Sequence, residues 1–128
     1  MSQENVEIVR QGFEAYVRGD LSAALANHDP DVVFNPAEEP PIAGRDAVRA
    51  YIERWEEPWD EYVAEAEEFV DAEDRVVVTF HVRARGKASG AEVDARSYQV
   101  HTLREGKLVR MDEYMTRTEA LEAVGLSE

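Results

Sequence analysis

The spacing of hydrophobic residues changes once along the chain, near residue 61, and this change constrains the fold more than any other feature. Before it, apolar residues recur every three or four positions, as on one face of a helix. After it they alternate with polar residues, which predicts strands. Turn-forming pairs divide this second part at Glu73-Asp74, Ser89-Gly90 and Glu105-Gly106. Such short connections predict an antiparallel meander. Its four strands are expected at 61–71, 75–87, 92–104 and 107–116.

The first sixty residues predict three helices. Apolar residues at 6, 9, 13, 16 and 17 share one helix face, and Gly19 can end that helix. Asp20 can cap a second, short helix, in which Leu21 and Leu25 would point inward. The same helical spacing over 47–55 predicts a third helix, which Pro58 stops.

The remaining segments complete an α+β fold. Residues 31–35 predict a short strand, while three prolines make 36–44 an irregular loop. Thr116 followed by Glu119 matches a capping box for a last helix over 117–124. We therefore expect a single domain over 1–128. It would be a cone-shaped, curved, mixed or antiparallel sheet packed on three N-terminal helices, with a short C-terminal helix, that is, an α+β barrel.

The charge balance argues against several classes of partner. Lys and Arg number 14 against 28 Asp and Glu, which gives a formal net charge of −14. Such a field repels nucleic-acid phosphates and anionic membranes, so we expect neither as a partner. The chain has no cysteine, which excludes disulfides and thiolate chemistry. No apolar run approaches the roughly 18 residues of a membrane span, and the start lacks a signal-peptide pattern, so we expect a cytoplasmic protein.

Alternation within the strands indicates which side chains face the interior. In 75–87 the even positions are apolar, whereas the odd positions include His81, Arg83 and Arg85. The even face is therefore expected inside. In 92–104 the alternation does not decide between the two faces.

The strand at 107–116 is expected to carry an acid into the interior. Its odd positions, 109, 111, 113 and 115, are the more apolar set, and they place Glu113 between Met111 and Met115. An ionised carboxylate in such surroundings is costly unless it finds a partner.

Short motifs in a fixed order resemble one known family. A Gly-Arg-Asp-Ala-Val start to the third helix at 44–48, the segment 31–34 and the hairpin at 103–109 resemble the SnoaL-like branch of the nuclear transport factor 2-like superfamily. The resemblance covers essentially the whole chain. It implies a cone with an apolar pocket between sheet and helices, and it favours the odd positions of 92–104, which include His101, as pocket-lining. This fold hosts isomerases, cyclases, hydrolases, dehydratases and non-catalytic binding domains.

Departures from the family's ketosteroid isomerases narrow the chemistry. Asn35 stands where those enzymes carry a general-base aspartate, and an amide cannot abstract a proton at neutral pH. Gly12 and Gln99 replace the tyrosine and the oxyanion-binding acid of that site. Asn35 and Gln99 could still donate hydrogen bonds to a ligand carbonyl, with backbone capping as the alternative for Asn35.

Two further resemblances concern Glu113. Its position resembles that of a catalytic aspartate in limonene epoxide hydrolases. However, Phe34, Phe80 and Val82 replace the tyrosine, arginine and second aspartate of that site, which argues against epoxide hydrolysis. Polyketide cyclases of the SnoaL type also resemble this chain, and their chemistry needs an acid/base carboxylate beside a pocket for a flat polycycle.

The predicted site therefore centres on Glu113 as general acid or base, with His101 as its partner. The alternative is a satisfied polar pair, or a His101 on the solvent face. The other predicted substrate-binding residues are Asn35, Gln99, Phe13, Tyr16, Trp55, Phe80, Val82, Met111 and Met115. The aromatic members of this set could equally be plain core, because a core and a pocket wall share one composition.

The sequence implies no metal and no cofactor. No pair of histidines has metal-ligand spacing, and neither a Gly-rich phosphate loop nor a nucleophile elbow is present. His28 is expected at a helix C-terminus, or else at the pocket rim, and His81 on an exposed or interfacial face. The outer sheet face is unusually apolar, which predicts a homodimer through that face.

The expected function is small-molecule binding in an apolar pocket. The reaction would be acid/base catalysis of isomerase, cyclase or dehydratase type on an apolar, carbonyl-containing substrate. A non-catalytic ligand-binding or dimerisation module is the alternative, and the sequence leaves open whether the protein is an enzyme.

Overall fold

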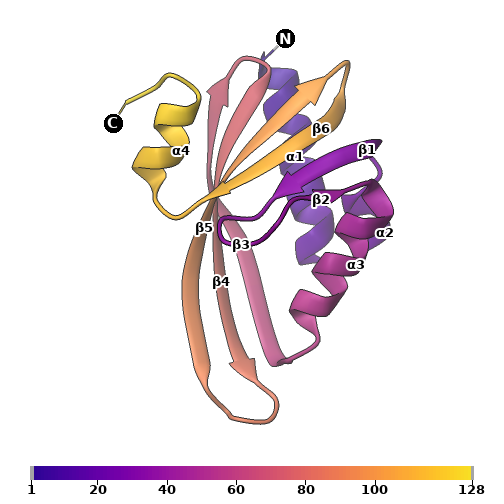
Figure 1. Cartoon of the computed structure of the whole chain (residues 1–128), viewed down its shortest axis with the longest axis vertical. Coiled ribbons are helices and arrows are strands. Elements are labelled where there is room, and N and C mark those ends of the chain that lie inside the picture. Colours follow the sequence, from indigo (N-terminus) through magenta and orange to yellow (C-terminus); the bar gives the residue numbers. More distant parts are fainter. Residues whose placement is uncertain (1, 128) are drawn as a thin grey trace.

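A six-stranded mixed sheet forms the framework of the protein (Figure 1). The computed structural model describes residues 2–127, and within them the strand order is β2-β1-β6-β5-β4-β3. β1 and β6 are parallel, and all other neighbours are antiparallel. The elements are α1 (Ser2–Val17), α2 (Leu21–Ala24), β1 (His28–Asn35), β2 (Ile42–Ala43), α3 (Arg45–Glu56), β3 (Trp59–Ala72), β4 (Arg75–Gly86), β5 (Glu92–Arg104), β6 (Lys107–Tyr114) and α4 (Arg117–Ala123). The expected α+β class and cone architecture are confirmed.

The four strands after residue 58 form the predicted meander. β3 pairs with β4, β4 with β5, and β5 with β6, each antiparallel. The turn between β5 and β6 has φ of 52° at Glu105 and 77° at Gly106. Two successive positive φ angles are typical of a type I′ turn, whose twist matches that of the strands it joins. The last hairpin is therefore tight, and it sets residues of β5 directly opposite residues of β6.

The helices cover the concave side of the sheet, and their packing creates the core. α1 packs against β3 and β4, α2 packs against α1, and α3 packs against β1 and β2 (Figure 1). The Asp20 side chain accepts a hydrogen bond from the Ala23 N–H, which is the predicted cap of α2. Val32, Val48, Val76 and Val78 are almost completely buried between these layers. The even face of β4 points inward, as its alternation predicted.

Two local predictions were wrong. The segment 36–44 is not wholly irregular, because Ile42–Ala43 pairs with β1 as the edge strand β2. The last proline precedes this pair, so both residues can form the ladder. The second prediction concerned β6, whose odd positions were expected to be the buried ones. The pairing of β5 with β6 shifts in register near Leu103, which lies opposite Leu108, and as a result Leu108 is buried whereas Val109 is half-exposed. A register shift of this kind changes whether odd or even positions face inward.

The short helix α4 lies on the other face of the sheet. Thr116 caps it by accepting from the Glu119 N–H, as the capping box predicted. Ala120 and Leu121 are buried against Val77 and Val100 of the outer sheet face. Part of the apolar outer face, expected to meet a second copy, is therefore covered by the chain's own last helix.

Because Leu121 seals this contact, we expect Leu121→Ala to lower the free energy of unfolding by about 2–4 kcal/mol. The side chain is 3% exposed, so its removal leaves a cavity beneath α4. Chemical denaturation followed by circular dichroism measures the effect. Glu122→Ala, at an exposed position of the same helix, should change stability by less than about 0.5 kcal/mol. Equal stabilities of the two variants would contradict the packing described.

Candidate functional site

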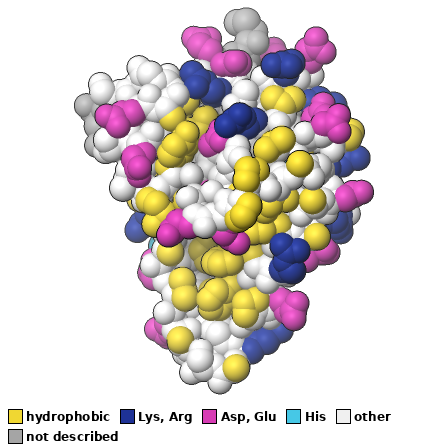
Figure 2. Space-filling view, in the orientation of Figure 1, with side chains coloured by type: hydrophobic (Ala, Val, Ile, Leu, Met, Phe, Trp, Pro, Cys, Tyr) yellow, Lys and Arg dark blue, Asp and Glu magenta, His cyan; other side chains and the backbone are white. Residues whose placement is uncertain are grey.

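A cavity of about 670 Å³ lies between the concave face of the sheet and the helices. This volume is in the range of small-molecule sites, which are roughly 300–1,000 Å³. Its walls come from α1, α2, α3, the loop after β1 and the inner faces of β3 to β6. Figure 2 shows hydrophobic side chains gathered on one face of the molecule, with acidic side chains beside them. The cavity thus has apolar walls and carries a small number of polar groups.

Glu113 lies on the inner face of β6, in the lining of this cavity. Its Oε2 accepts a hydrogen bond of 2.6 Å from the Ser97 hydroxyl, and its Oε1 accepts one of 3.1 Å from the Ala37 backbone N–H. The side chain is partly buried. These two donors supply the partners without which a carboxylate in apolar surroundings would be costly.

A chain of hydrogen bonds continues along β5 from Glu113. Gln99 Nε2 donates to the Ser97 hydroxyl at 3.1 Å, and His101 Nε2 lies 2.9 Å from Gln99 Oε1. Because Gln99 offers its carbonyl oxygen to the imidazole, His101 Nε2 must be the protonated nitrogen. Alternate residues of a strand share a face, and Gln99 sits opposite Glu113 in the sheet register. In each of these three hydrogen bonds the donated hydrogen therefore points along β5 toward the Glu113 carboxylate.

His101 is sealed at the inner end of this chain. It is 5% exposed, and the Phe13 ring lies 5.4 Å from its own, centroid to centroid. Burial lowers the pKa of His101 to about 3, with a smaller contribution from His28. The imidazole is therefore neutral near pH 7. Its predicted partnership with Glu113 is indirect, through Gln99 and Ser97.

Aromatic side chains form another part of the wall. Tyr16 and Tyr62 share a hydrogen bond of 2.8 Å between their hydroxyls, and Trp55 Nε1 donates to Tyr62 at 3.2 Å. Burial is the largest cause of the raised pKa of both tyrosines, so both stay neutral. The Phe80 ring lies 5.0 Å from Phe13 and 5.8 Å from Tyr16.

The structure places almost all of the predicted site residues in one lining. It brings together Glu113, His101, Gln99, Phe13, Tyr16, Trp55, Phe80, Val82, Met111 and Met115. Trp55 and Met115 are 40% and 62% exposed, which places them at the rim. Ser97 was not among the predicted site residues, although it stands two residues from Gln99 on the same strand face.

Asn35 is the exception, and its predicted place in the pocket is wrong. Its amide donates to Asp112 Oδ1 at 2.8 Å, and it does not belong to the lining. On β1 the inward residues are Val32 and Phe34, so Asn35 projects from the opposite face. The alternation of the strand, rather than the resemblance, decides its orientation.

His28 follows the second of its two expected placements, whereas His81 is not on an exposed face. His28 starts β1 and lines the cavity, so it belongs to the pocket rather than to a helix end. Burial, followed by the charge of Arg45, lowers its pKa to about 4, and its Nδ1 has no hydrogen-bond partner within residues 2–127. His81 is not exposed: its side chain is buried on the outer sheet face.

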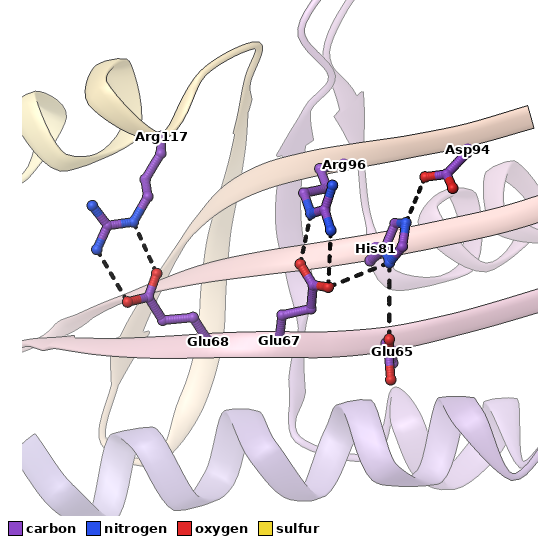
Figure 3. A network of polar contacts seen from close by, with 7 residues as sticks. All are labelled: Glu65, Glu67, Glu68, His81, Asp94, Arg96 and Arg117. Carbon is purple, nitrogen blue, oxygen red and sulfur yellow. Dashed lines mark hydrogen bonds and ion pairs between the residues drawn. The ribbon is translucent and has the colours of Figure 1, made fainter.

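Carboxylates surround His81 on that outer face (Figure 3). Its Nε2 lies 2.6 Å from Asp94 Oδ1, and its Nδ1 lies 3.3 Å from Glu67 and 3.8 Å from Glu65. Glu65, Glu67 and His81 could offer ligand atoms to a metal, since these atoms lie within 4.8 Å of one another. However, Arg96 already binds both oxygens of Glu67, at 2.7 and 3.2 Å. We therefore interpret the group as an ion-pair network.

Comparison with known sequences identifies one family. The profile of the SnoaL-like domain family matches residues 9–111. No curated protein matches the chain by sequence. None of the helices within the described residues has the length and apolar character needed to cross a membrane.

Solved structures of similar fold include three that align over nearly their whole length. An NTF2-like protein of unknown function from Burkholderia pseudomallei K96243 is 23% identical, with a TM-score of 0.78 over 95% of this chain and 98% of its own. TerC, co-crystallised with polyporic acid, is 19% identical, with a TM-score of 0.77 over 94% of this chain and 98% of its own. A Jannaschia sp. CCS1 protein that carries the name SnoaL-like polyketide cyclase is 18% identical, with a TM-score of 0.80 over 99% and 95%. These identities establish a shared fold.

His101 and His28, the two histidines of the cavity lining, predict a loss of stability in acid. Their pKa values of about 3 and about 4 in the folded protein lie below the ordinary histidine value of 6.5. Below pH 6.5 the unfolded chain binds protons that the folded chain does not, so stability falls as the pH falls toward 4. Each histidine contributes up to about 1.4 kcal/mol per pH unit. Denaturation of His101→Gln should therefore show about 2 kcal/mol less loss than wild type between pH 7 and 5. An imidazole NMR titration of His101 with a midpoint near 6.5 would contradict this account.

Proposed function

The chain belongs to the SnoaL-like domain family, and on that premise we propose that it binds a small apolar molecule in its cavity and transfers a proton with Glu113 as general base. The observation that carries the proposal is the convergence of two hydrogen-bond donors on this one carboxylate. Ser97 donates to one oxygen and Ala37 to the other. Both donors hold the carboxylate in one orientation toward the cavity, where it can accept a proton. Each oxygen keeps a lone pair with which to reach the substrate.

His101 has a different role in this proposal. Because it is neutral and sealed, it does not exchange protons with the substrate directly. It fixes the Gln99 amide, which in turn fixes the Ser97 hydroxyl toward Glu113. His101 and Gln99 are therefore positioning residues, and the orientation of the base depends on them.

The substrate class follows from the neighbouring groups. Gln99 carries two amide hydrogens, of which Ser97 uses one. The second can donate to a ligand carbonyl held beside Glu113, and a carbonyl acidifies the adjacent C–H bond. Proton removal from that carbon is the first step of isomerisation, of aldol-type cyclisation and of dehydration. TerC, a protein of similar fold, was co-crystallised with the small molecule polyporic acid.

Self-association is part of the proposal. On the outer sheet face, Val63 of β3 is 54% exposed, and Tyr98 and Tyr114 are partly buried beside the cluster under α4. These side chains leave apolar surface in contact with water on that face. A second copy of the chain that packs there would remove it from water.

We expect Glu113→Gln to abolish proton transfer while leaving ligand binding in place. The amide keeps the shape but cannot act as a base, so the rate should fall at least ~100-fold. Because the substrate is unidentified, the measurement is deuterium incorporation beside the carbonyl of a panel of cyclic ketones in D2O, followed by NMR. Glu122→Gln, at an exposed position on α4, is the matched control. Binding without exchange in wild type would instead favour a non-catalytic ligand-binding domain.

Removal of the Ser97 hydroxyl should disorder the Glu113 carboxylate. Without this donor the carboxylate is no longer held in one orientation toward the substrate, so Ser97→Ala should slow deuterium exchange roughly 10- to 100-fold. Ser97→Thr keeps the hydroxyl and should restore the wild-type exchange rate. An unchanged exchange rate in Ser97→Ala would separate the hydrogen-bond chain from catalysis.

A further inference from the structure

We propose that the cavity selects ligands that carry a positive charge, namely apolar aromatic amines that are protonated at neutral pH. This inference narrows the substrate class of the site described above and so rests on the proposed function for the identity of that site. It assigns Glu39 as the counter-ion of the ammonium group. Three features of the lining support it: its net charge, the absence of basic partners for two of its carboxylates, and its aromatic rings. The net charge of the whole chain is a fourth.

The charged groups of the lining are strongly unbalanced. Four carboxylates line the cavity, from Glu14, Glu38, Glu39 and Glu113, against the single guanidinium of Arg18. The two histidines of the lining do not offset this charge, because their lowered pKa values keep them neutral. An anionic ligand would add a further negative charge to this set, whereas a cationic ligand would reduce it.

Two of these carboxylates lack a basic partner. Within residues 2–127, neither Glu39 nor Glu113 forms an ion pair; their hydrogen bonds come from neutral donors. The Tyr51 hydroxyl donates to Glu39 at 2.7 Å. The pKa of Tyr51 is raised by burial, then by Glu39 and in part by the charge of Glu113, which shows that both carboxylates act on the same region. Arg54 stacks over the Tyr51 ring at 6.0 Å, but it is not part of the lining.

Aromatic rings line the same cavity as these carboxylates. Tyr51, Trp55, Tyr62 and Tyr16 all line the cavity, and Tyr51 is bonded to Glu39 itself. Aromatic faces attract cations, and Trp and Tyr are the stronger partners. Their apolar surface also accommodates a flat hydrocarbon skeleton. The carboxylates can pair with an ammonium group while the rings contact the organic skeleton that carries it. This combination therefore suits an organic ammonium better than an inorganic cation, which has no such skeleton.

Glu39 and Glu113 can have different roles, one as counter-ion and the other as base. Glu39 is exposed, whereas Glu113 is partly buried on the sheet. An ammonium at the mouth would pair with Glu39 and leave Glu113 free to accept a proton from the body of the ligand. The formal charge of −14 adds a long-range attraction for cations and repels anions.

Three probes with one skeleton test the inference: 2-naphthylmethylamine, 2-naphthylmethanol and 2-naphthoate. Their binding to the full chain is measured by isothermal titration at pH 7, at low and high salt. The amine should bind at least ~10-fold more tightly than the alcohol, and the carboxylate most weakly. High salt should reduce the preference for the amine. Equal affinities, tightest binding of the carboxylate, or no binding of the amine would each overturn the inference.

Two variants test whether Glu39 causes the preference for the amine. Glu39→Gln should reduce amine affinity at least ~3-fold more than it reduces alcohol affinity, whereas Glu122→Gln should change neither. Retention of the full preference in Glu39→Gln would overturn the assignment of Glu39. The two proposals fail separately. Amine preference without deuterium exchange would reject catalysis alone, and exchange of neutral ketones without any charge preference would reject the present inference alone.

Discussion

The site depends on the hydrogen bonds that let a carboxylate remain in an apolar cavity. Glu113 faces methionine and aromatic side chains, where an unpartnered charge would be expensive. Ser97 and the Ala37 N–H meet its two oxygens. Both depend on the fold: Ser97 needs the β5–β6 register, and Ala37 needs the loop that follows β1. The β5–β6 turn with its two positive φ angles therefore determines the local chemistry as well as the topology.

One strand supplies different chemistry to the two faces of the sheet. Inward residues of β5 form a chain of neutral hydrogen-bond donors that ends at Glu113. Outward residues Asp94 and Arg96 join an ion-pair network with His81 and Glu67, in which His81 and Arg96 hold the pKa values of Asp94 and Glu67 low. Within residues 2–127, the carboxylates of the cavity lining form no such ion pairs. This difference explains why the outer charges are satisfied within the protein while the inner ones remain available to a ligand.

The sequence predicted most of the fold because its periodicity is a local property. The strands of the meander and the caps at Asp20 and Thr116 follow from neighbouring residues, and Glu113 was identified from alternation alone. Predictions failed where a resemblance overrode the local pattern or where contacts come from elsewhere in the chain. Asn35 was assigned to the pocket by resemblance, although the alternation of β1 turns it toward Asp112. The burial of His81 depends on carboxylates from other strands, which spacing along one strand cannot reveal.

Ser97 shows the same limit for the site itself. A lone serine in a strand carries no motif, and its importance comes only from Glu113 across the register and Gln99 two residues away. The alternation of β5 was ambiguous because its inward face is polar, with Ser97, Gln99 and His101 in succession. A strand interior built only for stability would be apolar there. An inward polar row linked by hydrogen bonds is therefore a sign of function, and here it leads from a sealed imidazole to Glu113, a partly buried carboxylate of the cavity.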